Sequence, residues 1–196
     1  MINTCKTTTL PHYSQIAGVM PNDANIEFGG NRKTKTVIWL QHGNSHYFAD
    51  LPLQFYTLLK SAYLKDHKAQ RFLTEVADEQ RRQVELYTYY MYGDLDGQPD
   101  ITNGKLGPSE NFRDQRNCPS LLWHSKNINI GNHILTPRQL VIIDLIGNDV
   151  PDKAIASSLG ISIKTFDYHK SKLFKAVGAF TKTSLLKLAL THKIVA

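Results

Sequence analysis

The chain has 196 residues, which is enough for one large domain or two small ones with a proper hydrophobic core. Its apolar fraction of 41% and charged fraction of 20% are ordinary for a globular protein, and no run approaches the roughly 18 apolar residues of a membrane span. Two far-separated cysteines, Cys5 and Cys118, exclude a disulfide framework, and the first residues lack the pattern of a secretory signal. We therefore expect a cytoplasmic protein without a membrane partner.

The net charge of +6 is unevenly distributed along the chain. Residues 135–196 contain nine Lys and Arg against four Asp and Glu, a net charge of +5, whereas the preceding residues carry a net charge of +1. A basic excess confined to one segment is typical of a surface that binds a polyanion, although a solvated charged face is an equal alternative from charge alone.

The N-terminal half predicts a small, mainly helical domain with minor β structure. Residues 1–33 are rich in turn formers, so we expect loops and a short helix around 13–19. The β-branched and aromatic run 36–40 predicts a strand. Apolar residues at helical spacing then predict three helices, at 55–63, 69–76 and 79–92.

Tyrosines gather at the end of the third of these helices: Tyr87, Tyr89, Tyr90 and Tyr92. They suggest either a ligand pocket or, as we favour, ordinary helix packing with the hydroxyls at the surface.

No metal, cofactor or catalytic residue is predicted. Asp94, Asp96 and the following Gly97 resemble the start of a calcium-binding EF-hand loop, but Pro99 occupies the position that needs glycine and Lys105 the position of the final carboxylate. His42 and His46 are more simply a surface loop than a metal site, which needs three or four donors. Cys118 has no acid–base partners that define an enzyme, so we expect none.

The segment 118–134 is interpreted as a linker or a short hairpin that packs against the final module, with Trp123 as its anchor. This divides the chain into an N-terminal regulatory or interaction domain at 1–117, the connecting segment at 118–134, and a DNA-binding domain at 135–196.

The final segment has the helix-start and helix-stop signals of four successive helices. Thr136 and Gln139 form a capping box with Pro137 at the first helical position, and an apolar helix follows. A short helix begins near Pro151, Gly160 supplies a turn, and a third helix runs over 163–177 with Ser162 as its N-cap. A last helix begins near residue 183.

The third helix has two chemically different faces when it is wound at 100° per residue. The apolar face collects Ile163, Phe166, Leu173, Phe174 and Val177, and the opposite face collects Lys164, Thr165, Tyr168, Ser171, Lys172 and Lys175. Ammonium and hydroxyl groups suit phosphate oxygens, and an exposed helix ridge fits the major groove of DNA.

Residues 135–190 resemble the LuxR-type (GerE-like) helix-turn-helix domain of bacterial transcriptional regulators. The matching residues include Thr136-Pro137-Arg138, Lys153, Ile155-Ala156, Leu159-Gly160-Ile161-Ser162, Lys164-Thr165, His169 and Lys175. The resemblance does not extend upstream: residues 1–110 contain one convincing strand and lack the paired acidic residues expected of a receiver domain, and they resemble no known ligand-binding domain.

The resemblance implies a regulator that binds double-stranded DNA through the third helix. By position, it implies that phosphates are bound by Ser162, Lys164, Thr165, Lys172 and Lys175, and that bases are contacted by Asp167, Tyr168 and Ser171. Asp167 departs from the basic residue common in the family, and a carboxylate is repelled by phosphates unless it accepts from a cytosine amino group.

The resemblance also implies a homodimer formed through the last helix, by way of Leu185, Leu186 and Ala189, with RNA polymerase or a regulatory protein as a further partner. The alternative function is a protein-interaction module that uses the same helices to dock a transcription partner. Such a module would bind DNA negligibly.

Overall fold

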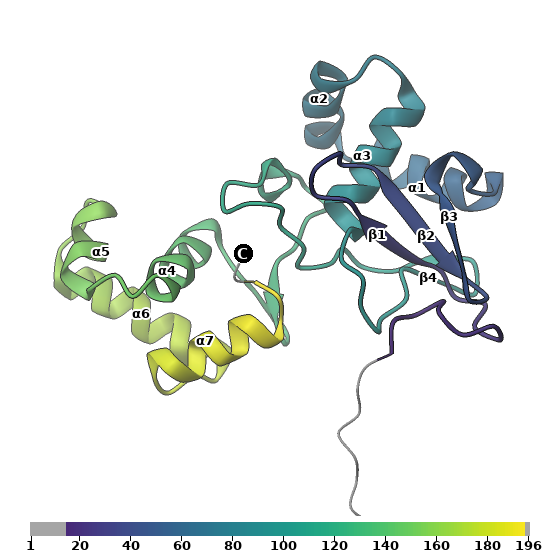
Figure 1. Cartoon of the computed structure of the whole chain (residues 1–196). Coiled ribbons are helices and arrows are strands. Elements are labelled where there is room, and N and C mark those ends of the chain that lie inside the picture. The colour runs from purple at the N-terminus through teal and green to yellow at the C-terminus, as the bar shows by residue number, and fades with distance from the viewer. Residues whose placement is uncertain (1–14, 195–196) are drawn as a thin grey trace, which may run out of the picture.

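The computed structural model describes residues 15–194, and helices predominate in it (Figure 1). Buried apolar side chains form two separate clusters, one built from residues 26–123 and the other from residues 128–194. The chain leaves the first cluster after Trp123 and enters the second at Ile128, so the two hydrophobic cores are consecutive in sequence.

A three-stranded antiparallel sheet lies in the N-terminal half, with strand order β1 (Glu27–Gly30), β2 (Val37–Gln41), β3 (Asn44–Tyr47). β2 is the predicted strand. His42 and Gly43, with φ of 51° and 78°, form the turn between β2 and β3, and His46 stacks on Trp39 with ring centroids 4.3 Å apart.

Helices α1 (Leu53–Lys65), α2 (His67–Val76) and α3 (Gln80–Tyr92) lie where the periodicity predicts them. α2 is capped by the buried carboxylate of Asp66, which accepts hydrogen bonds from the backbone N–H groups of Lys68 and Ala69. The short elements of this half are a 3₁₀ turn (Phe48–Asp50) and the two-stranded pair β4 (Ile101–Thr102) and β5 (Lys105–Leu106). The helix expected at 13–19 begins outside the described residues, and residues 15–19 form turns.

The tyrosines of α3 are buried between the sheet and the other helices. We expected their hydroxyls to lie at the surface, but the structure places them inside the protein. The hydroxyl of Tyr87 donates to the Ser125 hydroxyl at 3.0 Å, and that of Tyr92 donates to the Gly107 carbonyl at 3.3 Å. Tyr90 accepts a hydrogen bond from Lys35 at 2.6 Å. These three hydroxyl groups are therefore satisfied inside the protein, whereas the buried hydroxyl of Tyr89 has no hydrogen-bond partner among the described residues.

Trp123 packs against the N-terminal core, which corrects its expected role as an anchor on the final module. Its ring stacks on Tyr87, with centroids 5.8 Å apart, and meets Tyr90 edge-on. Trp123 follows a 3₁₀ turn (Pro119–Leu122), and the hairpin β6 (Asn129–Ile130) and β7 (His133–Ile134) comes next. Cys118 is buried beside this turn, and Cys5 lies outside the described residues.

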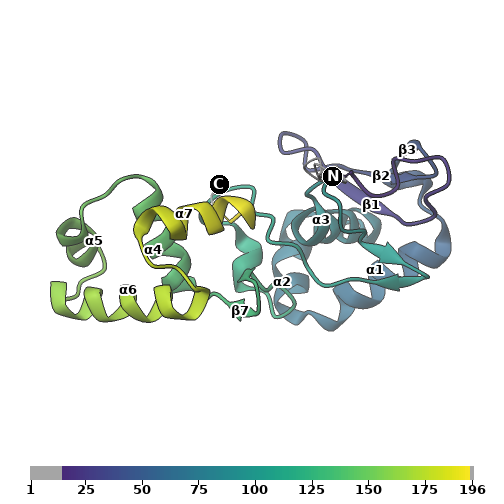
Figure 2. The ribbon, with the colours of Figure 1, turned by 90° about the horizontal axis from the view of Figure 1, so that it is seen from below.

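Helices α4 (Pro137–Gly147), α5 (Asp152–Ser158), α6 (Ile163–Val177) and α7 (Lys182–Thr191) enclose the second core. The capping box of Thr136 and Gln139 is present at the start of α4. A second capping box, from Thr181 and Ser184, begins α7. In both views α5 and α6 lie at the end of the molecule away from the three-stranded sheet (Figures 1 and 2).

The two halves are joined by the segment that contains Asn111 and Arg113. Arg113 makes a buried two-pronged ion pair with Asp144 of α4, at 3.0 and 2.9 Å, and also donates to the carbonyl of Ile194. The Asn111 amide donates to the carbonyls of Asn129 and His192, both at 2.8 Å. The chain just after α7 is therefore fixed to a segment of the N-terminal half whose Phe112 belongs to the first core.

No helix within residues 15–194 is long and apolar enough to cross a lipid bilayer.

Candidate DNA-binding surface

The turn between α5 and α6 is set by a glycine and a serine. Gly160 has φ of +63°, a backbone conformation that glycine adopts without steric cost, and its Cβ position faces open space. Ser162 then accepts a hydrogen bond from the Thr165 N–H at 3.1 Å, which fixes the first turn of α6. These local interactions place a 15-residue helix, roughly 22 Å long, directly after a short one.

One face of α6 is anchored in the second core. Phe166 and Leu173 are fully buried, while Phe174 and Val177 are half-buried against them. Ile163, expected on the same face, is 46% exposed because it begins the helix one turn before the first buried residue. The buried residues fix the rotation of the helix and thus determine which side chains face solvent.

The other face of α6 carries the predicted contact residues, and the structure exposes all of them. Lys164, Lys172 and Lys175 make no ion pair with any residue of the described part of the chain, so their ammonium groups are available to an external anion. Tyr168 is 63% exposed although it is aromatic. The exposed set is Ser162, Lys164, Thr165, Asp167, Tyr168, Ser171, Lys172 and Lys175.

The carboxylate of Asp167 is neutralised within the helix. Lys170 lies 2.9 Å from Asp167 and 2.6 Å from Asp152 of α5, and Lys182 of α7 lies 2.7 Å from the other oxygen of Asp152. Partial burial raises the pKa of Asp152, but the hydrogen bonds from Lys170 and Lys182 outweigh it and lower that pKa overall. Lys170 is not among the residues predicted for this surface, although its i, i+3 spacing from Asp167 is the signal for such a pair.

Helix α7 exposes fewer apolar side chains than its sequence suggests. Leu185 and Ala189 are fully buried in the second core, and Leu186 is half-buried. Leu190 is 65% exposed. A contact between two copies through α7 would therefore use Leu186 and Leu190, since Leu185 and Ala189 are already covered by the protein's own core.

A short helix, a tight glycine turn and a longer helix whose exposed face carries unpaired cations make up a helix-turn-helix unit, the class of module that presents a helix to duplex DNA. Residues 133–189 match the family model described as "GerE: Bacterial regulatory proteins, luxR family". The C-terminal unit is therefore a LuxR-family domain.

Three curated proteins are similar to this chain over segments of 57 to 65 residues. The chain is 40% identical to the transcriptional regulatory protein MctR of Rhizobium johnstonii over 65 residues. This aligned segment covers 33% of the chain and 30% of MctR. The chain is 36% identical over 62 residues to the oxygen regulatory protein NreC of Staphylococcus aureus, covering 32% and 29%. For the response regulator Rre1 of Synechocystis the identity is 33% over 57 residues, covering 29% and 25%.

The chain thus spans less than a third of the length of these relatives, and each match covers at most 33% of this chain. No solved structure matches the chain.

Proposed function

We propose that this protein is a bacterial transcriptional regulator that binds duplex DNA by placing α6 in the major groove. The observation that carries the proposal is the exposed face of α6, where three lysines without ion-pair partners in the described chain flank Tyr168 and Ser171. A major groove about 12 Å wide admits one α-helix. The names of the similar proteins, which are those of regulators, support the same function.

The side chains divide by chemistry into two groups. Ser162, Lys164, Thr165, Lys172 and Lys175 bind phosphate oxygens in this proposal, and Tyr168 and Ser171 lie on the ridge that faces base edges. Asp167 keeps its partner Lys170, which offsets the repulsion between the carboxylate and the phosphates. Asp167 contacts a base only where a cytosine amino group can replace the lysine.

We further propose that two copies pair on DNA through α7 and bind two half-sites. The apolar surface open to such a contact is Leu190 with the half-buried Leu186. An isologous contact places the same residues of both copies against each other, so one substitution changes the interface twice. Leu190→Glu is therefore expected to weaken pairing without disturbing the core of the unit.

The N-terminal half is proposed to be the part that receives a signal or a protein partner, such as RNA polymerase. It has its own hydrophobic core, and it is connected to the DNA-binding unit through Asn111 and Arg113 rather than through α6. Since α5 and α6 lie at the far end of the molecule, the proposed DNA-binding face is open in this structure (Figure 2). A signal would therefore act on the unit through α4 and α7.

The test is the binding of fluorescently labelled duplex DNA by the full-length protein, followed by anisotropy at several salt concentrations. The wild-type protein is expected to bind with a steep salt dependence, because each phosphate that is neutralised releases counterions. Lys172→Glu/Lys175→Glu should lower the logarithmic salt slope by about two and weaken binding at every salt concentration.

The matched control is Lys65→Glu/Lys68→Glu, which makes the same charge change at exposed positions of the N-terminal half. It should leave binding nearly unchanged if α6 is the contact surface. Equal losses in both double variants would mean that net charge alone governs binding. Undetectable binding by the full-length wild-type protein even at low salt concentration would refute the proposed function and favour an interaction module.

A further inference from the structure

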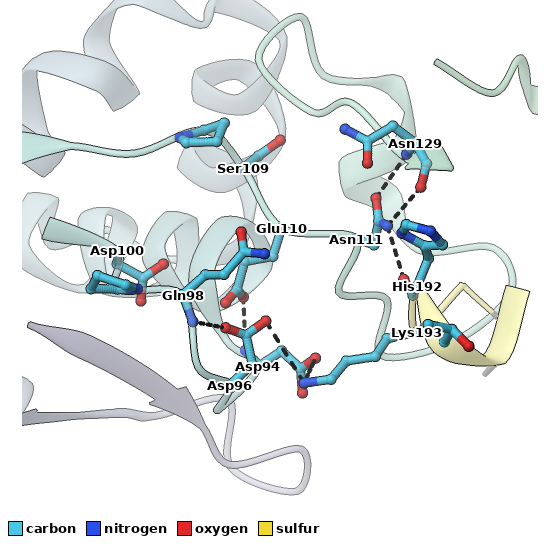
Figure 3. A pocket seen from close by; sticks show the side chains of 13 residues that line it. Asp94, Asp96, Gln98, Asp100, Ser109, Glu110, Asn111, Asn129, His192 and Lys193 are labelled. Atoms are coloured by element: carbon cyan, nitrogen blue, oxygen red, sulfur yellow. Dashed lines mark hydrogen bonds and ion pairs between the residues drawn. The ribbon is translucent and has the colours of Figure 1, made fainter. Parts of the chain in front are cut away.

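Carboxylates from three separate parts of the chain converge between the two halves of the protein. Glu27 comes from β1, Asp96 from the loop after α3, and Glu110 from the segment after β5; one oxygen atom of each lies within 4.8 Å of the others. Asp96 and Glu110 border a polar cavity of about 230 Å³, which His192 and Lys193 line from the α7 side (Figure 3), and Glu27 is buried behind them.

Two of these carboxylates each have a buried oxygen without a hydrogen-bond partner. Glu27 is fully buried; its Oε1 accepts from the Asp96 N–H at 2.6 Å, and its Oε2 has no partner among the described residues. The Oε2 of Glu110 accepts from the Asp94 N–H at 2.9 Å, while its Oε1 is buried without a partner. Such oxygens are costly to bury, and a bound cation would satisfy them.

The negative charge of the cluster is poorly balanced. Asp94 lies beside it, and the one cation that forms an ion pair with these acids in residues 15–194 is Lys193, at 2.7 Å from Asp94 and 3.8 Å from Asp96. Burial raises the pKa of Glu27 to about 8 and that of Glu110 to about 9. With these raised pKa values, Glu27 and Glu110 are largely protonated near neutral pH, whereas a cation bound beside them would favour their ionised form.

We propose that Glu27, Asp96 and Glu110 bind a divalent cation of the calcium class, which competes with the ammonium group of Lys193 for the carboxylates of Asp94 and Asp96. Oxygen donors alone select hard cations. Calcium–oxygen distances of about 2.3–2.6 Å allow two ligands to lie up to about 5 Å apart, whereas magnesium restricts them to about 4 Å. The three oxygen atoms lie within 4.8 Å of one another, a spacing that calcium–oxygen bonds can span throughout its range.

This site is not the EF-hand that the sequence excludes. An EF-hand takes its ligands from one 12-residue loop, whereas Glu27 is separated from Asp96 by 69 residues along the chain. The site also stands independently of DNA binding, because it is defined by carboxylates of the N-terminal half. Lys193, which follows α7, connects it to the LuxR-family domain, so an ion would weaken one contact between the halves.

Calcium chloride titrated into the full-length protein at pH 7.5 tests the proposal, with binding followed by calorimetry and by the shift in melting temperature. One ion per chain is expected. Glu110→Gln removes a ligand but keeps the size of the side chain, and should lower the affinity at least about tenfold, the smallest loss usual for a perturbed metal site. Glu27→Gln is the second variant, and circular dichroism without calcium verifies that both are folded.

Glu75→Gln is the matched control, since Glu75 is exposed on α2 away from the cluster. Lys193→Ala should raise the affinity for calcium severalfold, whereas Lys187→Ala, at an exposed position of α7, should not. Absence of both heat and a melting shift at millimolar calcium would overturn the proposal and identify the cluster as neutral carboxylic acids. Unchanged affinity in Glu110→Gln would place the ion elsewhere, and unchanged affinity in Lys193→Ala would refute the competition.

Discussion

The buried ion pair between Arg113 and Asp144 provides the sharpest test of how the C-terminal unit is stabilised. The Arg113 side chain is 1% exposed and that of Asp144 is 8% exposed, and two parallel hydrogen bonds join them. Removing one partner of such a pair leaves an uncompensated charge in the interior, which costs about 3–5 kcal/mol. A small domain has a total stability of about 5 kcal/mol, so Asp144→Asn should bring the unit close to its unfolding transition at 25 °C.

The two tryptophans make this loss measurable in one part of the molecule. Trp39 and Trp123 both lie in the N-terminal core, so tryptophan fluorescence reports on that half, whereas circular dichroism reports on the helices of both. In urea, Asp144→Asn should show an early loss of helical signal while the fluorescence transition stays near its wild-type midpoint. Non-coincident transitions of this kind indicate that the two cores unfold separately.

A double variant distinguishes the charge effect from a packing effect. Arg113→Met/Asp144→Leu replaces both charges by apolar groups of similar size and should recover most of the stability that either single change removes. The reasoning is refuted if each single substitution costs less than about 1 kcal/mol, which is the range of an exposed ion pair. It is also refuted if the two losses add in the double variant.

Three further substitutions test other features of the fold. Lys126 is buried with its ammonium group on the Tyr90 carbonyl, and burial lowers its pKa from 10.5 to about 8. The unfolded chain therefore binds more protons than the folded chain between pH 8 and 10.5, so stability rises with pH through this window, and this rise should be absent in Lys126→Met. At pH 7 Lys126→Met should be more stable by about 3 kcal/mol in urea unfolding, the free energy that corresponds to this change of pKa. Tyr89→Phe should leave the melting temperature equal or higher, because the Tyr89 hydroxyl is buried without a partner in the described chain, and a clear decrease would show that it has one. Thr136→Ala removes the cap of α4 and should cost about 1 kcal/mol in the helical transition, with no change in tryptophan fluorescence.

The elements that could be predicted from sequence are those whose signals are local. α6 begins at the serine cap and ends at Gly178, which has φ of +71°, and both signals lie within a few residues of the helix. β1 could not be predicted, because Gly29 and Gly30 are poor strand formers. Glycine is present there because of a tertiary contact: a Cβ atom on residue Gly30 would lie 2.6 Å from the ring of Tyr89, where α3 crosses the strand.

The same distinction applies to the two candidate sites. The exposed face of α6 follows from helical periodicity once the buried face is known, so its residues could be named from the sequence. The carboxylate cluster depends on long-range pairing, because the Phe28 N–H donates to Asp100 and the Asp96 N–H to Glu27. Nothing within the neighbourhood of Glu27, Asp96 or Glu110 in the sequence indicates that they meet.

The contacts of Asn111 and Arg113 also set an order of events during synthesis on the ribosome. The N-terminal core is complete once Trp123 has emerged, so it can form while the rest of the chain is still being made. Asn111 and Arg113, however, must wait for His192 and Ile194, about 81 residues later. Attachment of the end of α7 to the N-terminal half is therefore the last step of folding. A nascent chain stalled before residue 192 would lack Ile194 of the second core and the contacts of Asn111 with His192 and of Arg113 with Ile194.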